Sequence, residues 1–399
     1  MENIQREIYL ARLRPFKDIN LIKVITGIRR CGKSTLLRQF RDELSTSGVA
    51  EKQIQSINFE NPDYGYNANW KEIYDKLNKN LQKSKMNYIF LDEVQYVPEF
   101  ERLLVGLQTK ENVDLYVTGS NSHILSSELA TLLSGRSVEI PILPFSFQEY
   151  QESLNSPTNP QTAFDNYLSF GGFPQAVSIF KRDQNSIDQY LSGVYETVVG
   201  RDILDRGQIT DKIALNKVVR YLLDNIGNAT STHSIAVALE LSDRKVEQII
   251  ESLTASFLFY RLDRLDVKGK KLLKTQEKYY TVDSGLRWAI LGRDASTDKG
   301  HLLENIIFLE LLRRGNKISI GKVGEKEVDF VVRDPSGYTS YYQVAWTVNS
   351  KETLEREVSP LEKISDFSPR FLITMDPGEE SLNGIKRINA ITWLLNENN

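Results

Sequence analysis

The chain has 399 residues, which predicts two or three domains, and 40% of them are hydrophobic, enough to form buried cores. Its 50 basic and 53 acidic residues nearly cancel, so any nucleic-acid site must be a local patch. The polar start, the lack of a long apolar run and the single cysteine argue against a signal peptide, a membrane span and an internal disulfide, and predict a cytoplasmic protein.

After a short predicted helix at 8–13, an apolar strand at 21–26 leads into Gly-x-x-x-x-Gly-Lys-Ser at 27–34, and a helix is predicted over 34–44. In this strand–loop–helix context the pattern predicts a phosphate-binding loop. The glycines let the backbone wrap around an anion, Lys33 supplies positive charge for the phosphates, and Ser34 offers a hydroxyl to Mg²⁺. The predicted nucleotide-binding residues here are Gly27, Ile28, Arg29, Arg30, Cys31, Gly32, Lys33, Ser34 and Thr35. Cys31 lies beside Lys33, which predicts a thiol that favours the thiolate form; the alternative is a buried and inert thiol.

A second predicted strand, 88–92, ends in two carboxylates. Beside a phosphate-binding loop, Asp92 would complete the Mg²⁺ site with Ser34, and Glu93 would polarise an attacking water. This pair favours nucleotide hydrolysis over transfer to a small acceptor.

Further strands at 55–60, 113–120 and 137–143 alternate with predicted helices at 70–81, 100–107 and 124–133. This alternation predicts a parallel sheet covered by helices on both faces, with the ligand at the carboxyl ends of the strands. Ser120 and Asn121 follow one of these strands. They either reach the γ-phosphate or the attacking water, Ser120 as a nucleotide ligand and Asn121 as a catalytic residue, or cap the next helix.

Several segments resemble the prokaryotic AAA-type ATPases that carry a C-terminal domain of unknown function. These segments are 27–37, 91–95, 118–122, 133–136, 144–150, 171–174 and 199–202, and the resemblance continues over nearly the whole chain. It implies an AAA-type P-loop ATPase core at 1–160, a helical lid at 161–210, a winged helix at 211–282 and an α/β domain similar to the restriction-endonuclease-like PD-(D/E)xK fold at 283–399. It favours ATP as the nucleotide. It also places Arg136 in an arginine motif that acts on the γ-phosphate in cis or from a neighbouring subunit; the alternative is a surface arginine.

The pattern at 211–282 itself predicts a winged helix, because helices at 213–223, 232–239 and 242–253 precede a hairpin over 257–281. The predicted DNA contacts are Arg244 and Lys245 near the start of the last helix and Lys268, Lys270 and Lys271 in the wing, where Lys274 and Lys278 extend the basic patch. The alternative is a module that packs against protein.

The C-terminal third carries a predicted helix at 301–315 and strands at 317–321, 327–332 and 341–346. In the nuclease fold that it resembles, a helix Glu, a strand Asp and a Glu-x-Lys pair hold a divalent metal. Glu304 and Asp329 match, but Gln343 and Ala345 replace the third element, so we expect an inactive or strongly altered site. A lysine supplied instead by Lys322 or Lys326 is the alternative.

These features predict a Mg²⁺-dependent ATPase whose nucleotide cycle switches or moves the winged-helix and nuclease-like domains. The expected partners are ATP and ADP, DNA through the winged helix, and a second copy of the chain if Arg136 acts in trans. The alternatives are an ATP-regulated DNA nuclease and a nucleotide-dependent signalling switch that recruits a protein partner.

Overall fold

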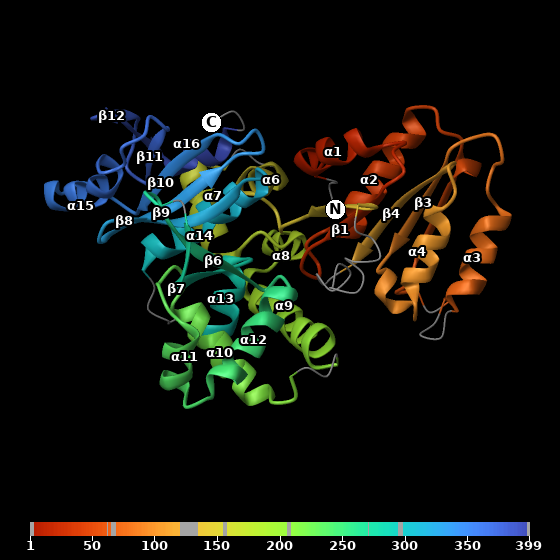
Figure 1. The fold of residues 1–399 in the computed structure, drawn as a ribbon, viewed down its shortest axis with the longest axis horizontal. Helices are drawn as coiled ribbons and strands as arrows, with labels where there is room; N and C mark the ends of the chain where they lie inside the picture. Colours follow the sequence, from red (N-terminus) through yellow and green to blue (C-terminus); the bar gives the residue numbers. More distant parts are fainter. Residues whose placement is uncertain are drawn as a thin grey trace. The chain divides into compact units, whose positions relative to one another are not determined.

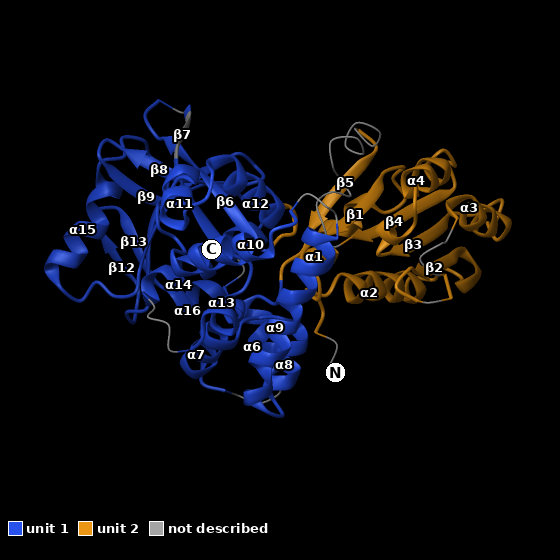
Figure 2. Ribbon diagram, turned by 90° about the horizontal axis from the view of Figure 1, so that it is seen from below, with its two compact units in different colours: residues 1, 144–254, 258–399 blue, residues 2–143, 255–257 orange. Residues whose placement is uncertain are grey.

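The computed structural model of the chain describes residues 4–61, 63–64, 69–119, 135–154, 158–205, 209–269, 271–293 and 298–396. The chain divides into two compact units, shown in Figure 2. The N-terminal unit comprises residues 2–143 and 255–257, and the C-terminal unit comprises 144–254 and 258–399. None of the helices in the described ranges combines the length and apolar character needed to cross a membrane.

The N-terminal unit is built on a five-stranded sheet in which all neighbouring strands are parallel. The strands lie in the order β2 (Ile54–Asn58), β3 (Asn87–Asp92), β4 (Val113–Gly119), β1 (Ile22–Thr26) and β5 (Ser137–Pro141). Helix α2 (Lys33–Thr46) lies on one face, beside α1 (Glu7–Leu13), and α3 (Trp70–Lys79) and α4 (Phe100–Gln108) cover the other (Figure 1). The predicted parallel sheet with helices on both faces is confirmed, while the predicted helix at 124–133 lies outside the described residues.

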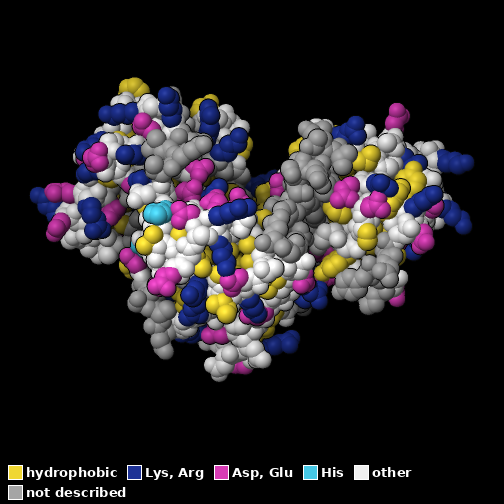
Figure 3. Space-filling view, turned by 60° about the horizontal axis from the view of Figure 1, so that its bottom comes forward, with side chains coloured by type: hydrophobic (Ala, Val, Ile, Leu, Met, Phe, Trp, Pro, Cys, Tyr) yellow, Lys and Arg dark blue, Asp and Glu magenta, His cyan; other side chains and the backbone are white. Residues whose placement is uncertain are grey.

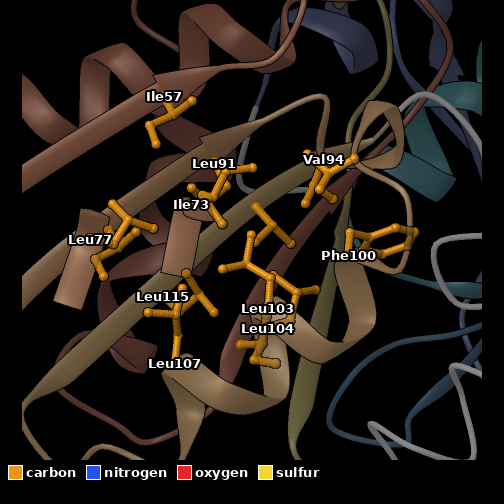
Figure 4. Close-up of a cluster of buried hydrophobic side chains, with 14 of the residues drawn as sticks. Ile57, Ile73, Leu77, Leu91, Val94, Phe100, Leu103, Leu104, Leu107 and Leu115 are labelled. Atoms are coloured by element: carbon orange, nitrogen blue, oxygen red, sulfur yellow. The ribbon is translucent and has the colours of Figure 1, made fainter. Parts of the chain in front are cut away.

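The apolar spacing of α3 and α4 explains why they pack on the sheet. Ile73 and Leu77 are four residues apart on α3, and Leu103 and Leu107 are four apart on α4, so each pair lies on one helix face. Figure 4 shows these side chains directed toward the sheet, among Ile57, Leu91, Val94, Phe100, Leu104 and Leu115. Burying such a side chain contributes about 1.5–3 kcal/mol. The resulting core holds the strand ends in fixed positions.

The first part of the C-terminal unit is helical. It contains α6 (Phe147–Ser153), α7 (Pro160–Phe170), α8 (Pro174–Phe180) and α9 (Ile187–Thr197), which continues as a π-helix over Val198–Leu204. Helix α13 (Ser284–Leu291) packs against α7 and α9 although it lies far from them in sequence. Short 3₁₀ helices elsewhere in the chain are Arg14–Phe16, Glu51–Gln53, Val94–Tyr96 and Gln184–Ser186.

The Gly-Gly-Phe-Pro sequence between α7 and α8 receives the cap of α13. Asp283 accepts hydrogen bonds from the backbone N–H of Gly172 at 2.7 Å and of Gly285 at 2.9 Å. A Cβ on Gly171 would lie 2.0 Å from Asp283 Oδ1, and its φ of +75° is one that glycine tolerates best. The glycines therefore allow two distant segments to approach closely.

The remainder of the C-terminal unit joins three helices to a large mixed sheet. The helices are α10 (Lys212–Asp224), α11 (Thr232–Leu239) and α12 (Asp243–Ala255), and the hairpin β6 (Phe259–Asp266)–β7 (Lys271–Thr281) follows them. Then come α14 (Lys299–Arg313), β8 (Lys317–Val323), β9 (Lys326–Arg333), β10 (Thr339–Ala345), α15 (Lys351–Glu362), β11 (Arg370–Thr374), β12 (Glu380–Leu382), β13 (Ile385–Asn389) and α16 (Ala390–Leu395). All eight strands form one sheet in the order β12-β13-β11-β10-β9-β8-β6-β7, with β6 parallel to β8. The hairpin is therefore part of the same sheet as the C-terminal third.

Candidate functional site

The loop between β1 and α2 has the backbone that an anion site needs. Gly27 and Gly32 have φ values of 142° and 108°, and Arg30 also has a positive φ of 68°. A Cβ on Gly27 would lie 2.3 Å from the carbonyl oxygen of Ile142, so a side chain there would clash with backbone. Among the described residues, α2 starts at Lys33 without a side-chain cap, which leaves its first N–H groups for an anion.

Lys33 is buried in this loop and faces an acidic side chain. Its Nζ donates to the carbonyl oxygens of Gly27 at 3.1 Å and Ile28 at 3.3 Å, and lies 3.4 Å from Glu93 Oε1. Burial acts to raise the pKa of Glu93, but the charge of Lys33 and a hydrogen bond from Gln95 outweigh it, so the pKa is lowered. Glu93 is therefore a carboxylate at neutral pH, within reach of the phosphate-binding lysine.

Asp92 is held by hydrogen bonds from three neighbouring segments. Its Oδ1 accepts from Thr118 Oγ1 at 2.5 Å, its Oδ2 accepts from Asn58 Nδ2 at 3.1 Å, and the Ser34 hydroxyl also hydrogen-bonds to it. Burial raises the pKa of Asp92, although the hydroxyls of Thr118 and Ser34 act in the opposite direction. A buried carboxylate beside a hydroxyl is an oxygen-rich donor set that suits Mg²⁺.

Thr118 connects the Asp92 carboxylate to the backbone of Glu93. Its Oγ1 donates to Asp92 and accepts from the backbone N–H of Glu93 at 2.8 Å. The order β3-β4-β1 places β4 between the two strands that carry Asp92 and the phosphate-binding loop. Sequence reasoning missed Thr118 and Asn58, although each is a polar residue at the carboxyl end of a strand. The predicted Ser120 and Asn121 lie outside the described residues.

Of the two arginines in the loop, one side chain is buried and the other is exposed. Arg29 is buried, donates to Tyr96 Oη at 3.3 Å and lies 3.7 Å from Glu60 Oε1. Arg30 is exposed, so it is the loop arginine open to solvent. Thr35 accepts a hydrogen bond from Arg38 at 3.4 Å.

Cys31 contributes to the loop through its backbone. Its side chain is fully buried, and burial raises the pKa of its thiol despite the nearby charges of Lys33 and Arg6. The prediction of a thiolate is therefore wrong, because desolvation outweighs the electropositive setting. Its carbonyl oxygen accepts from the Arg6 guanidinium at 3.0 Å, and Arg6 also donates to the carbonyl of Leu143 at 2.8 Å. Arg6, which precedes α1, thus links the phosphate-binding loop to the residues that follow β5.

Arg136 lies at the amino ends of the strands, opposite the carboxyl ends that carry the phosphate-binding loop and Asp92. It precedes the first residue of β5, Ser137, which is in register with Ile22, the first residue of β1. Its carbonyl oxygen accepts from the Ile22 N–H at 2.8 Å. The length of β1 therefore separates Arg136 from the loop that follows Thr26, about 13 Å at about 3.3 Å per residue. This position contradicts a role in cis and leaves the trans and surface alternatives.

The predicted nuclease-like residues Glu304 and Asp329 do come together, but around Lys278, which we predicted to belong to the basic patch of the wing. Nζ of Lys278 lies 2.9 Å from Glu304 Oε1 and 3.2 Å from Asp329 Oδ1. Gln343 accepts from the Asp329 N–H at 3.3 Å and does not contact the ammonium. Of the two predicted alternatives, Lys326 donates to Ser359 instead, and the ammonium beside Glu304 and Asp329 is that of Lys278 rather than of Lys322 or Lys326.

The predicted DNA contacts are only partly available. Lys278 is buried, which removes it from the basic patch, and Lys245 pairs with Asp211. Arg244, Lys268 and Lys271 are exposed, while Lys270 lies outside the described residues. On the face shown in Figure 3, basic and acidic side chains are interspersed over the coloured surface.

Comparisons with known proteins agree with the geometry of the loop. Residues 20–151 match the AAA domain family, and residues 161–297 match a domain of unknown function. An uncharacterized protein of Haemophilus influenzae is 36% identical over 402 residues, covering 98% of both chains. An uncharacterized protein of Methanocaldococcus jannaschii is 28% identical over 369 residues, covering 86% of this chain and 78% of its own.

One solved structure shares the fold over most of its length. The Walker-type ATPase of Pyrococcus abyssi has a TM-score of 0.50 at 15% identity, and the match covers 72% of this chain and 96% of that one. Together with the family match, this likeness supports an AAA-type P-loop ATPase fold.

Proposed function

Because this chain belongs to the family of the Haemophilus influenzae relative, with an AAA domain followed by a domain of unknown function, we propose that it is a Mg²⁺-dependent ATPase. The observation that carries this proposal is the cluster of Lys33, Asp92 and Glu93, which Thr118 holds together at one strand edge. A cluster of this kind supplies both phosphate binding and a base for water.

Each residue has a separate task in the proposed reaction. The loop N–H groups and Lys33 bind the phosphates, so Lys33 exchanges its contact with Glu93 for the nucleotide. Glu93 then accepts a hydrogen bond from the attacking water and orients it toward the γ-phosphate. Ser34 and Asp92 would hold Mg²⁺, which neutralises phosphate charge when bound. Thr118 and Asn58 position Asp92.

The proposal is tested by phosphate release from the pure full-length chain with Mg²⁺ and ATP. We expect wild-type turnover, and we expect Lys33→Ala to lose both nucleotide binding and turnover. Lys76→Ala is a matched control, because Lys76 lies on α3 and its ammonium contacts the Tyr64 side chain. Wild-type turnover in Lys33→Ala would show that another site or a contaminant hydrolyses ATP.

We further propose that Arg136 acts on the nucleotide of a neighbouring copy of the chain. Support comes from its exposure and from its distance from its own loop. Turnover per chain should then rise with protein concentration, and an arginine supplied in trans contributes roughly 10³–10⁵-fold to rate. Mixing Arg136→Ala with Lys33→Ala chains should restore activity that neither has alone. A rate independent of concentration, with no recovery in mixtures, would make Arg136 a surface residue.

For the C-terminal unit we propose the predicted lid at 161–210, a winged helix at 211–282 and a nuclease-like domain at 283–399 that does not cut DNA. The helix–helix–helix–hairpin order supports the winged helix, and the shared sheet indicates that it moves together with the nuclease-like part. Exposed Arg244, Lys268 and Lys271 are the DNA contacts to test. DNA binding that weakens steeply with salt and fails in the triple alanine variant would support them; unchanged binding would exclude them.

A further inference from the structure

Three carboxylates converge on one buried ammonium in the C-terminal unit. Lys278 on β7 lies 2.9 Å from Glu304 Oε1 on α14, 2.9 Å from Glu327 Oε1 and 3.2 Å from Asp329 Oδ1, both on β9. Only 6% of the Lys278 side chain is exposed. An ammonium has three N–H donors, so it can direct one to each carboxylate.

The ammonium is fixed in this place by its own strand. Tyr280, two residues further along β7 and on the same side of the strand, donates to Glu304 Oε1 at 2.6 Å. The Tyr280 ring stacks on Phe308 of α14 with ring centroids 4.5 Å apart. Burial lowers the pKa of Lys278, but Glu304 and the other acidic neighbours raise it well above its usual value, so the lysine stays charged.

Carboxylate oxygens gathered in this way are also the ligands that divalent cations take. A cavity of 430 Å³ opens beside the cluster and includes Lys278, Glu304, Asp329 and Gln343 in its lining, so ions from solvent have access. A metal ion would need the same oxygens as the ammonium, and the two cations would repel each other at this range. Within the described part of the chain, no group of three or more acidic, histidine or cysteine side chains is arranged to hold a metal. The three carboxylates here stand at the distances of an ammonium, so a metal that replaced it would have to draw their oxygens inward.

We propose that the Lys278 ammonium is the resident cation of this carboxylate site, in the place that a divalent metal would otherwise take. The wild-type chain then binds no divalent cation here, and removing the ammonium creates a cation site from Glu304, Glu327 and Asp329. Gln343 fits this assignment, because its amide donates to Glu357 at 3.0 Å and accepts from the Asp329 backbone, so it adds no charge. The inference does not depend on the proposed ATPase function.

The test is Mn²⁺ binding to the full chain without nucleotide, measured by equilibrium dialysis and by the shift of melting temperature between EDTA and Mn²⁺. Wild type should show no bound Mn²⁺ and no shift that Asp329→Asn removes. Lys278→Ala should melt lower than wild type in EDTA, bind one Mn²⁺ per chain more than wild type and recover part of its melting temperature as Mn²⁺ is raised. The double variant Lys278→Ala with Asp329→Asn should lose the bound metal.

Lys278→Gln keeps much of the side-chain stem and replaces Lys278→Ala if that variant fails to fold. A wild-type chain that binds Mn²⁺ and loses it in Asp329→Asn would overturn the proposal. A folded Lys278→Ala or Lys278→Gln chain that binds no Mn²⁺ would also overturn it. The comparison of wild type with Asp329→Asn needs no substitution at Lys278, and it separates metal bound here from metal bound at the proposed Ser34–Asp92 site, so it decides the first half of the proposal.

Discussion

Lys33 and Lys278 are both buried beside carboxylates, but their partners differ in kind. Lys33 contacts two neutral carbonyl oxygens at 3.1 and 3.3 Å and one carboxylate at 3.4 Å. Lys278 contacts three carboxylates, two of them at 2.9 Å. Contacts to carbonyls are easily exchanged for a phosphate, whereas removal of a buried lysine from three carboxylates leaves uncompensated charge. The difference separates a lysine that binds a ligand from one that holds the fold together.

The largest expected effect is on turnover, at the site that contains Lys33. Glu93→Gln removes the carboxylate 3.4 Å from Lys33 and the proposed base, so turnover should fall by about 10²–10⁴ while nucleotide binding is kept. Fluorescent-nucleotide titration and phosphate release measure the two effects. Glu60→Gln is the matched control, because Glu60 contacts Arg29 of the same loop but is far more exposed. Normal turnover in Glu93→Gln would remove the assignment of the base.

The comparison also predicts unequal losses of stability. Lys278→Ala should lower the free energy of unfolding by about 3–5 kcal/mol, because it leaves buried carboxylates unpaired. Lys33→Ala should cost clearly less, since two of its three partners are neutral. Urea denaturation measures both, with Lys326→Ala, whose partner is the Ser359 hydroxyl, as a control. Equal losses of unfolding free energy for Lys33→Ala and Lys278→Ala would mean that the two lysines do not differ in their contribution to stability.

A smaller effect is expected from the residue that joins the two carboxylates of the nucleotide site. Thr118→Val keeps the shape but removes the hydroxyl that bonds Asp92 and the Glu93 N–H. Leaving these buried groups unpaired costs about 1–3 kcal/mol, and turnover should fall by roughly tenfold to a hundredfold. Thr118→Ser should restore most of the rate. A Thr118→Ser variant as slow as Thr118→Val would mean that the methyl packing, rather than the hydroxyl, matters.

The smallest effect is expected at Cys31. Its buried thiol has a raised pKa, so the protonated form persists to higher pH in the fold than in the unfolded chain. Maleimide labelling of the native chain should therefore be almost absent near pH 7, with or without Mg²⁺ and ATP, and complete in denaturant. Mass spectrometry measures the adduct on this single cysteine. Rapid native labelling that ATP prevents would restore the prediction of a reactive thiol.

The sequence was sufficient to predict the proposed nucleotide site wherever that site depends on local spacing. Gly27, Gly32 and Lys33 belong to one continuous loop, and Asp92 and Glu93 end an apolar strand, so their roles follow from neighbours in the chain. Thr118 and Asn58 could not be chosen in this way. Their importance depends on the strand order that brings β2, β3 and β4 together, and that order comes from tertiary packing.

In the C-terminal unit, too, the pairing of strands could not be predicted from the local sequence. The helices and strands predicted between 213 and 346 lie close to their predicted ranges, whereas none was predicted for α13 or beyond residue 346. The pairing of β6 with β8 has no local signature. Without that pairing, Lys278 appeared to belong to an exposed basic wing. With it, Lys278 is buried beside Glu304 and Asp329. Charge patterns predict a surface only when the sheet neighbours of a strand are known.

The most direct test of the account is the ATP-induced shift in melting temperature of wild type, Lys33→Ala and Lys278→Gln, each measured with Mg²⁺ in the same buffer. A ligand that binds only the folded chain raises its melting temperature. We predict a shift for wild type, none for Lys33→Ala, and a retained shift for Lys278→Gln from a lower starting temperature. A shift that persists in Lys33→Ala and disappears in a folded Lys278→Gln chain would mean that the nucleotide binds near Lys278 rather than near Lys33, and would contradict the account.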